Sequence, residues 1–302
     1  MTETSPWDAK VEQLLDELEI SSPDGRHSLK EAFESVRDLE AQQVTPILRR
    51  TIHRIFERSM GEFFSDETAT SMQLPANLAR FTLPDPDGIT LPHADDLPSL
   101  SFAEVLESRR SRRDYQNRPL KLEELSKVLQ MAFLSNTMED GYGIRNIPQL
   151  PYPNIGGLDP VEIVVIVNGV VDLDRGHYRY DKVGHALVPV ASGDYRQPLL
   201  NATFENDWLF YAPAIIILSN DQRKVAWKYK TRGYRIAFMD LGAAMQNLYL
   251  ACTATQLSCC AVAGYQDDKI YSPGGDRSVG CVMPIGPCSQ GGPSSSHKRD
   301  EM

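Results

Sequence analysis

Lys228 and Tyr229 stand side by side after Trp227, directly before a long apolar stretch. Both side chains have an ordinary pKa near about 10, so neither accepts a proton at neutral pH unless burial or a neighbouring charge shifts it. A lysine made neutral by desolvation, or a tyrosine deprotonated beside a lysine cation, would act as a general base. Taken alone, the pair also fits a solvated basic helix end.

A second candidate is the run RRSRRDY from Arg109 to Tyr115. Its four arginines and one serine could hold a phosphate, the guanidinium groups bidentately and the hydroxyl through one hydrogen bond. The alternative is an exposed basic patch. The run lies between two predicted helices, the first opened by the capping-box pattern of Ser101 and Glu104. This setting favours a fixed geometry for the arginines.

Two glycine-containing stretches could approach a planar ligand closely. One is PNIGGLDP, from Pro153 to Pro160, which stands before a predicted buried strand. The other is Ala263-Gly264-Tyr265, at the end of another predicted strand. Glycine lets the backbone come near a ligand because it has no Cβ. An ordinary loop is the alternative for each. The glycine-rich motifs of Rossmann and Walker sites are absent.

Composition and charge limit the classes of function. The chain has 302 residues, 41% of them hydrophobic, and a formal net charge of -10. This acidity argues against binding to nucleic acids or anionic membranes. The five cysteines form no C-x-x-C pair and the six histidines are scattered, so we expect reduced thiols and no metal site. With a polar N-terminus and no long apolar run, we expect a cytoplasmic protein.

These residues must be positioned by a mixture of helices and strands, which predicts the α+β class. Apolar residues at helical spacing predict helices at 122–133 and 234–256. Residues 1–65 are predicted to be a helical extension, 66–98 a linker, 99–288 the main domain and 289–302 a disordered tail. β-Branched and apolar runs predict strands at 161–167, 177–180, 186–190, 214–218, 259–263 and 279–285.

Together these stretches resemble the nitroreductase-like flavoproteins, and more narrowly the SagB-type or McbC-type azoline dehydrogenases. The resemblance covers about residues 84–287, and Asn154 replaces the serine usual in that family. It is carried, in order along the chain, by the segments 109–115, 153–160, 176–181, 227–229, 232–235 and 246–247.

The resemblance implies a nitroreductase-like fold, with a central mixed or antiparallel sheet flanked by helices, and a homodimer that binds FMN at the subunit interface. It implies that Arg109, Ser111 and Arg113 contact the FMN phosphate and ribityl chain. It also implies that Asn154, Gly156 and Gly264 lie along the flavin ring. Many family members carry an arginine after the glycine of the last strand, where this chain has Gly286-Pro287.

The implied reaction oxidises a thiazoline or oxazoline of a peptide to the aromatic azole, with Lys228 and Tyr229 as the catalytic pair and a cyclodehydratase as a possible partner. Two other functions stay open at this point. One is an NAD(P)H-dependent reductase of nitro compounds or quinones, which has no need of a base at this position. The other is a non-catalytic, peptide-binding subunit of a modification complex.

Overall fold

The computed structural model describes residues 12, 16, 23, 26, 27, 30, 84–98, 100–204, 206–230, 232–266, 269–270 and 277–289. The chain divides into two compact units, Met1–Glu67 and Thr68–Met302. All six described residues of the first unit are helical. Among them, Arg26 pairs with Glu12 and Asp16, each at 2.8 Å. Most of the predicted helical extension, and the predicted tail beyond Ser289, lie outside the described residues.

A seven-stranded sheet forms the centre of the second unit, in the order β1-β6-β5-β4-β7-β9-β8. Every neighbouring pair is antiparallel. A separate two-stranded hairpin, β2–β3, pairs only with itself. The strands are β1 Ile89–Thr90, β2 Thr137–Gly141, β3 Ile144–Gln149, β4 Val161–Val167, β5 Gly176–Asp181, β6 Ala186–Ser192, β7 Ala214–Asp221, β8 Leu257–Cys259 and β9 Arg277–Pro287.

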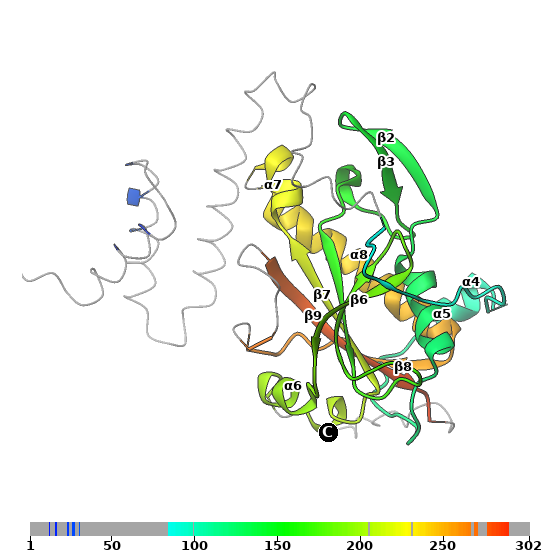
Figure 1. Cartoon of the computed structure of the whole chain (residues 1–302). Helices are drawn as coiled ribbons and strands as arrows, with labels where there is room; N and C mark the ends of the chain where they lie inside the picture. Colours follow the sequence, from blue (N-terminus) through cyan, green and yellow to red (C-terminus); the bar gives the residue numbers. More distant parts are fainter. Residues whose placement is uncertain are drawn as a thin grey trace, which may run out of the picture. The chain divides into compact units, whose positions relative to one another are not determined.

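Helices lie against the sheet and around its edges. Figure 1 shows the β2–β3 hairpin and α7 at one end of the sheet and α6 at the other. The longest helix, α8, packs on α5 and on the sheet. The helices and 3-10 turns are α4 Phe102–Ser108, α5 Leu122–Phe133, η4 Ile155–Gly157, α6 Arg196–Ala202, η5 Asp207–Leu209, α7 Arg223–Tyr229 and α8 Arg232–Ala254.

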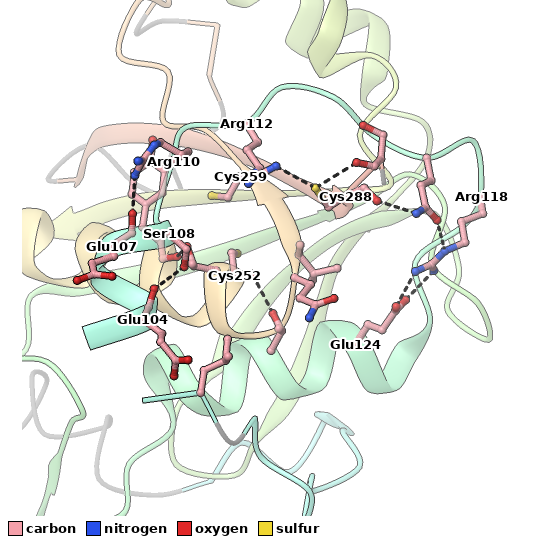
Figure 2. A pocket seen from close by; sticks show the side chains of 18 residues that line it. Glu104, Glu107, Ser108, Arg110, Arg112, Arg118, Glu124, Cys252, Cys259 and Cys288 are labelled. Atoms are coloured by element: carbon pink, nitrogen blue, oxygen red, sulfur yellow. Dashed lines mark hydrogen bonds and ion pairs between the residues drawn. The ribbon is translucent and has the colours of Figure 1, made fainter. Parts of the chain in front are cut away.

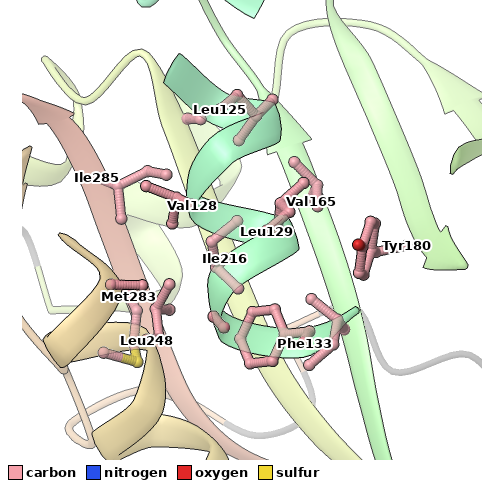
Figure 3. Packing of buried hydrophobic residues seen from close by; sticks show 14 of the residues in the cluster. Leu125, Val128, Leu129, Phe133, Val165, Tyr180, Ile216, Leu248, Met283 and Ile285 are labelled. Carbon is pink, nitrogen blue, oxygen red and sulfur yellow. The ribbon is translucent and has the colours of Figure 1, made fainter. Parts of the chain in front are cut away.

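The main core lies between the sheet and the pair α5 and α8. The apolar stripe of α5 faces inward because its residues recur every three or four positions. Burying each such side chain stabilises the fold by roughly 1.5–3 kcal/mol. Figure 3 shows the stripe against Val165, Ile216 and Met283 of the sheet and Leu248 of α8. The stripe consists of Leu125, Val128, Leu129 and Phe133.

The opposite face of the sheet is covered by α6, η5 and the segment around Val262. Val164 and Ile166 of β4 belong to this second core. Ile163 and Val165, which alternate with them along the strand, belong to the main core with α5 and α8. Both faces of β4 are therefore covered. This explains why its sequence is largely apolar and does not alternate regularly with polar residues.

Residues 84–98 contribute to the main unit, although the sequence suggested a linker here. Ile89–Thr90 form the edge strand β1 beside β6, and Leu91 is buried in the main core. The Ser126 hydroxyl donates to the Pro92 carbonyl at 2.5 Å and therefore accepts from Nε2 of His185 at 2.8 Å. Tyr180 is left to donate to Nδ1 of His185 at 2.7 Å. This chain of bonds requires a neutral imidazole at His185.

The long helix and its surroundings differ from expectation in two ways. Lys228 and Tyr229 end a separate helix, α7, and α8 begins at Arg232 after a break at Lys230, where φ is +49°. The β2–β3 hairpin was not predicted, because its first strand is exposed and has no alternation of apolar residues. Within the ranges described above, no helix combines the length and the apolar character needed to cross a membrane.

Candidate functional site

The arginine segment lies between α4 and α5 and carries no regular secondary structure before Tyr115. It begins where α4 ends, and Tyr115 forms an antiparallel bridge with Cys288 beside the end of β9. The Arg109 guanidinium lies 5.4 Å from the centre of the Tyr249 ring, and that of Arg113 lies 5.5 Å from the centre of the Trp208 ring. Ser111 Oγ lies 3.1 Å from Tyr249 Oη. Arg109 and Ser111 therefore meet at Tyr249 of α8, whereas Arg113 lies at Trp208 of η5.

Tyr249 of α8 joins this segment to the Gly264 segment. Its hydroxyl oxygen accepts a hydrogen bond from the Ala261 amide at 2.7 Å. Its proton is therefore available to Ser111 Oγ. Gly264 follows three residues after Ala261, is exposed, and a Cβ built there would meet no atom within 4 Å. Open space thus lies beside Gly264, three residues after the amide that binds Tyr249.

Part of the arginine segment lines a cleft of about 880 Å³. Arg110 and Arg112 line it, together with Cys259 and Cys288, and none of the eight predicted site residues does (Figure 2). Its arginines donate to other groups that line it. Arg118 binds both carboxylate oxygens of Glu124 at 2.7 and 2.8 Å, and Arg110 donates to the Glu107 carbonyl at 2.8 Å. The cleft adjoins the predicted site at Tyr249, which lines it and also contacts Arg109 and Ser111.

The loop before β4 holds Asn154 and Gly156. The Asn154 side chain turns back into its own loop, where Oδ1 accepts from the Asp159 amide at 3.1 Å. Gly156 has φ +73°, and a Cβ there would lie 2.6 Å from the Tyr229 hydroxyl. Asp240 of α8 also holds the loop, because its Oδ1 accepts a hydrogen bond from the Ile155 amide at 3.0 Å. Only glycine fits position 156 without moving Tyr229.

Buried charges fix both ends of this loop. Asp159 pairs with Lys182 and also accepts from the Tyr152 hydroxyl at 3.0 Å. Lys182 donates in addition to the Val161 carbonyl at 2.6 Å. Burial raises the pKa of Asp240 to about 6, although the Ile155 amide opposes the shift. Asp240 Oδ2 is buried and has no hydrogen-bond partner in the described part of the chain.

Lys228 and Tyr229 lie against the Gly156 loop at the end of α7. Lys228 Nζ donates to the Tyr142 hydroxyl at 2.6 Å and lies 5.1 Å from the centre of the Tyr229 ring. Partial burial lowers the pKa of Lys228, but the hydrogen bond to Tyr142 and the neighbouring phenol of Tyr229 raise it more, and the net pKa is raised. The lysine is thus held as an ammonium ion, which disfavours a neutral lysine base.

A small apolar cluster positions this pair. Val225 of α7 and Ile236 and Ala237 of α8 are buried with Leu158 of the loop, and Tyr229 and Tyr142 pack against them. Gly233 lets α8 start close to α7, since a Cβ there would lie 3.0 Å from the Ala226 nitrogen. The break at Lys230 and this close packing direct the end of α7 towards the loop.

The predicted residues therefore form two groups. The first group, beside Tyr249 and Trp208, is Arg109, Ser111 and Arg113. The second group, around Tyr142, is Lys228 and Tyr229 with Asn154 and Gly156 of the loop. Gly264 follows the segment that binds Tyr249. Helix α8 contacts both groups, through Asp240 and Tyr249. Nine residues of helix separate these contacts by roughly 13 Å along the axis.

Sequence reasoning missed Tyr142, Asp240 and Tyr249. The turn Gly141-Tyr142-Gly143 was a signal for a hairpin tip. The contacts of Asp240 and Tyr249 are tertiary, and both residues lie on a long helix whose pattern alone does not distinguish them from other buried residues.

Comparison with known proteins identifies the family. The nitroreductase family matches residues 106–272. A Methanocaldococcus jannaschii protein named for the nitroreductases is 30% identical over 175 residues, which are 58% of this chain and 84% of that protein. The Escherichia coli microcin B17-processing protein McbC is 27% identical over 156 residues, 50% of this chain, and the match spans only about half of McbC, 55%.

Among solved structures, a chain of the E. coli microcin synthetase McbBCD complex with truncated pro-MccB17 bound has a similar fold. The TM-score is 0.51 at 20% identity, and the match covers 83% of this chain and 98% of that one. The predicted α+β, nitroreductase-like fold is confirmed. The chain belongs to the nitroreductase family, whose activities make it an oxidoreductase.

Proposed function

We propose that this protein is an FMN-dependent dehydrogenase that oxidises thiazoline or oxazoline rings of peptides to thiazoles or oxazoles. The observation that carries the proposal is the Lys228–Tyr229 pair, held against the exposed Gly156 loop with the lysine charged. A reductase that only passes electrons between cofactors and small acceptors has no need of a tyrosine base beside a fixed lysine cation at this position. Similarity to McbC, a microcin B17-processing protein, supports the same function.

The residues present fit FMN. Two guanidinium groups and a hydroxyl, from Arg109, Arg113 and Ser111, come from one five-residue segment and form a donor set suited to a phosphate and its ribityl chain. The open space at Gly264 and the exposed backbone of Gly156 would lie along the ring. The Asn154 side-chain oxygen is already used by the Asp159 amide, so Asn154 would contact the ring through its backbone or its Nδ2.

The reaction removes one proton and one hydride from the azoline ring. When bound, FMN supplies the hydride acceptor. Tyr229 would take the proton at its oxygen, and the Lys228 ammonium beside it would stabilise the negative charge on that oxygen. The loop from Asn154 to Asp159 is fixed by Lys182 and Asp240. It would hold the flavin ring within reach of Lys228 and Tyr229. Molecular oxygen is the proposed final acceptor.

The proposed assembly is a homodimer that works with a cyclodehydratase on a peptide. The exposed side of α8 carries Met239, 59% exposed, and Tyr234, 45% exposed, whose ring lies 5.0 Å from that of Phe238. Such an apolar face on the longest helix supports a subunit contact. Support for a cyclodehydratase and peptide partner comes from the similarity to a chain of the McbBCD complex, which has truncated pro-MccB17 bound.

The test is oxidation of an azoline peptide, read as the loss of two hydrogens per ring by mass spectrometry. Lys228→Ala and Tyr229→Phe are expected to keep bound FMN and to lower turnover by about 10²–10⁴-fold, the usual contribution of general-base catalysis. Undiminished turnover in both variants would remove the pair from the mechanism. Wild-type protein that binds flavin but leaves azoline peptides unchanged would refute the proposed function.

A second candidate is an NAD(P)H-dependent reductase of nitro compounds or quinones. It is favoured by the M. jannaschii relative, which is named for the nitroreductases and is matched over 84% of its length. Rapid bleaching of the bound flavin by NADH or NADPH, without any azoline oxidation, would support this candidate over the first.

A further inference from the structure

Tyr142 lies at the tip of the β2–β3 hairpin and touches both parts of the proposed catalytic group. Its hydroxyl donates to the Gly156 carbonyl at 2.7 Å and accepts from Lys228 Nζ at 2.6 Å. We propose that Tyr142 is a positioning residue, which fixes the Lys228 ammonium and the Gly156 loop relative to Tyr229. The role in turnover rests on the proposed function, whereas the effect on Lys228 does not.

The backbone at the tip is unusual for a tyrosine. Tyr142 has φ +50° and Gly143 has φ +73°, the pattern of a turn with two left-handed central residues. Asn, Asp and Gly are preferred in the first of these places, and a bulky residue there is an outlier. Backbone outliers of this kind persist where the surroundings hold them, and they gather at functional sites. The contacts of the Tyr142 side chain supply such surroundings.

The ring of Tyr142 adds two contacts that the hydroxyl does not make. Lys228 Nζ lies 4.4 Å from the centre of the ring, a cation–π distance. The Trp227 ring meets it edge-on, with centroids 5.7 Å apart and planes at 88°. Since β2 and β3 pair only with each other, these contacts and the Gly156 bond attach the tip of the hairpin to α7 and the loop.

The direction of the hydrogen bonds assigns the protons. A phenol has one proton, and that of Tyr142 goes to the Gly156 carbonyl. The Tyr142 oxygen can therefore only accept from Lys228, which stabilises the charged form of the lysine and raises its pKa after burial has lowered it. Tyr142 therefore acts by fixing its neighbours and not as the proton acceptor, a role that the proposed function gives to Tyr229.

The experiment measures the ionisation of Lys228 directly. Purified flavin-loaded protein is acetylated with limiting acetic anhydride over a range of pH, and Lys228 modification is quantified by peptide mass spectrometry. Tyr142→Phe keeps the ring but removes the hydroxyl, so the amine loses an acceptor that favours its charged form. We expect Lys228 to react roughly tenfold faster below its pKa, the equivalent of one charge-assisted hydrogen bond.

Two further variants make the result specific. Tyr142→Asn suits the left-handed backbone and removes the ring as well, so it should increase Lys228 labelling further. Tyr211→Phe changes a tyrosine that is 73% exposed on the segment before β7 and should leave labelling unchanged. Labelling of Lys228 that is the same in wild type, Tyr142→Phe and Tyr142→Asn would overturn the proposal.

Turnover supplies a second readout. In Tyr142→Phe the alkaline limb of the pH–rate profile should move to lower pH, because the ammonium form of Lys228 is lost sooner; a merely structural tyrosine would lower the rate without this movement. A wild-type protein with no azoline oxidation but with the expected labelling change would refute the proposed function and leave the role of Tyr142 intact. An active wild type with no labelling change would refute only the role of Tyr142.

Discussion

Gly156→Ala tests whether the loop and Tyr229 are as tightly opposed as the structure indicates. Position 156 has φ +73°, where a residue with a Cβ loses roughly 1–2 kcal/mol of stability. The added Cβ would lie 2.6 Å from the Tyr229 hydroxyl, and ordinary contacts begin at 3.4 Å. The hydroxyl must therefore move by about 0.8 Å, and overpacking of this kind costs about 1–3 kcal/mol in addition.

A displacement of nearly 1 Å in a catalytic group can lower turnover by about 10²-fold. We expect Gly156→Ala to lose about that much azoline oxidation and to unfold at lower urea concentration. Gly157→Ala is the matched control, because position 157 also has a left-handed φ, +66°, but a Cβ there meets no atom within 4 Å. Gly157→Ala should lose only the stability that the left-handed backbone costs, and it should keep most of its activity.

A double-mutant cycle separates the clash from the backbone strain. In a Tyr229→Phe background the closest atom to the new Cβ is gone, and the next ones lie at 3.3 and 3.4 Å. Gly156→Ala should then be less destabilising than in the wild type, with an interaction energy of about 1 kcal/mol or more. Equal turnover in the two alanine variants, together with an interaction energy near zero, would refute the close contact between Gly156 and Tyr229.

Two more outcomes follow from the side chains. The variants Arg109→Ala and Arg113→Ala should purify with less FMN. The control Arg110→Ala changes a side chain that lines the cleft and should purify fully yellow. Equal flavin content in all three variants would contradict the phosphate site. Burial, with a smaller effect of His93, lowers the pKa of His185 to about 4 from its ordinary value of about 6.5. The neutral imidazole of His185 therefore contributes fully to the free energy of unfolding above pH 6.5. This contribution is lost as the pH falls towards 4, by up to about 3 kcal/mol. His185→Asn, which tolerates the local φ of +48°, should flatten this part of a plot of urea midpoint against pH, and an unchanged slope would contradict the assignment.

The sequence was most informative where one physical rule dominates. The strand at 161–167 was predicted correctly because both faces of β4 are covered and its residues are nearly all apolar. Helix α5 was predicted with its observed bounds because its inward stripe is regular. The arginine run was predicted to lie between two helices, and it follows α4 and precedes α5 in the structure.

Other features depend on contacts that no local pattern reveals. The break between α7 and α8 falls at Lys230, a residue with no turn preference of its own, and is set by the packing of Gly233 on Ala226. The β2–β3 hairpin carries few inward apolar residues, so its sequence lacks the alternation of apolar and polar residues that predicts a strand. The hydrogen bond between Tyr142 and Lys228 joins residues 86 positions apart and exists only in the folded chain.

The two sides of the proposed site are anchored to the protein very differently. The Gly156 loop continues into β4, a central strand, and is fastened by the buried pair of Asp159 and Lys182. The hairpin that carries Tyr142 lies outside the main sheet. Amide protons of β4 should therefore exchange only on global unfolding, whereas those of the hairpin should exchange through local opening. The proposed peptide substrate would thus enter by local opening of the hairpin, while the loop beside the proposed cofactor keeps its shape.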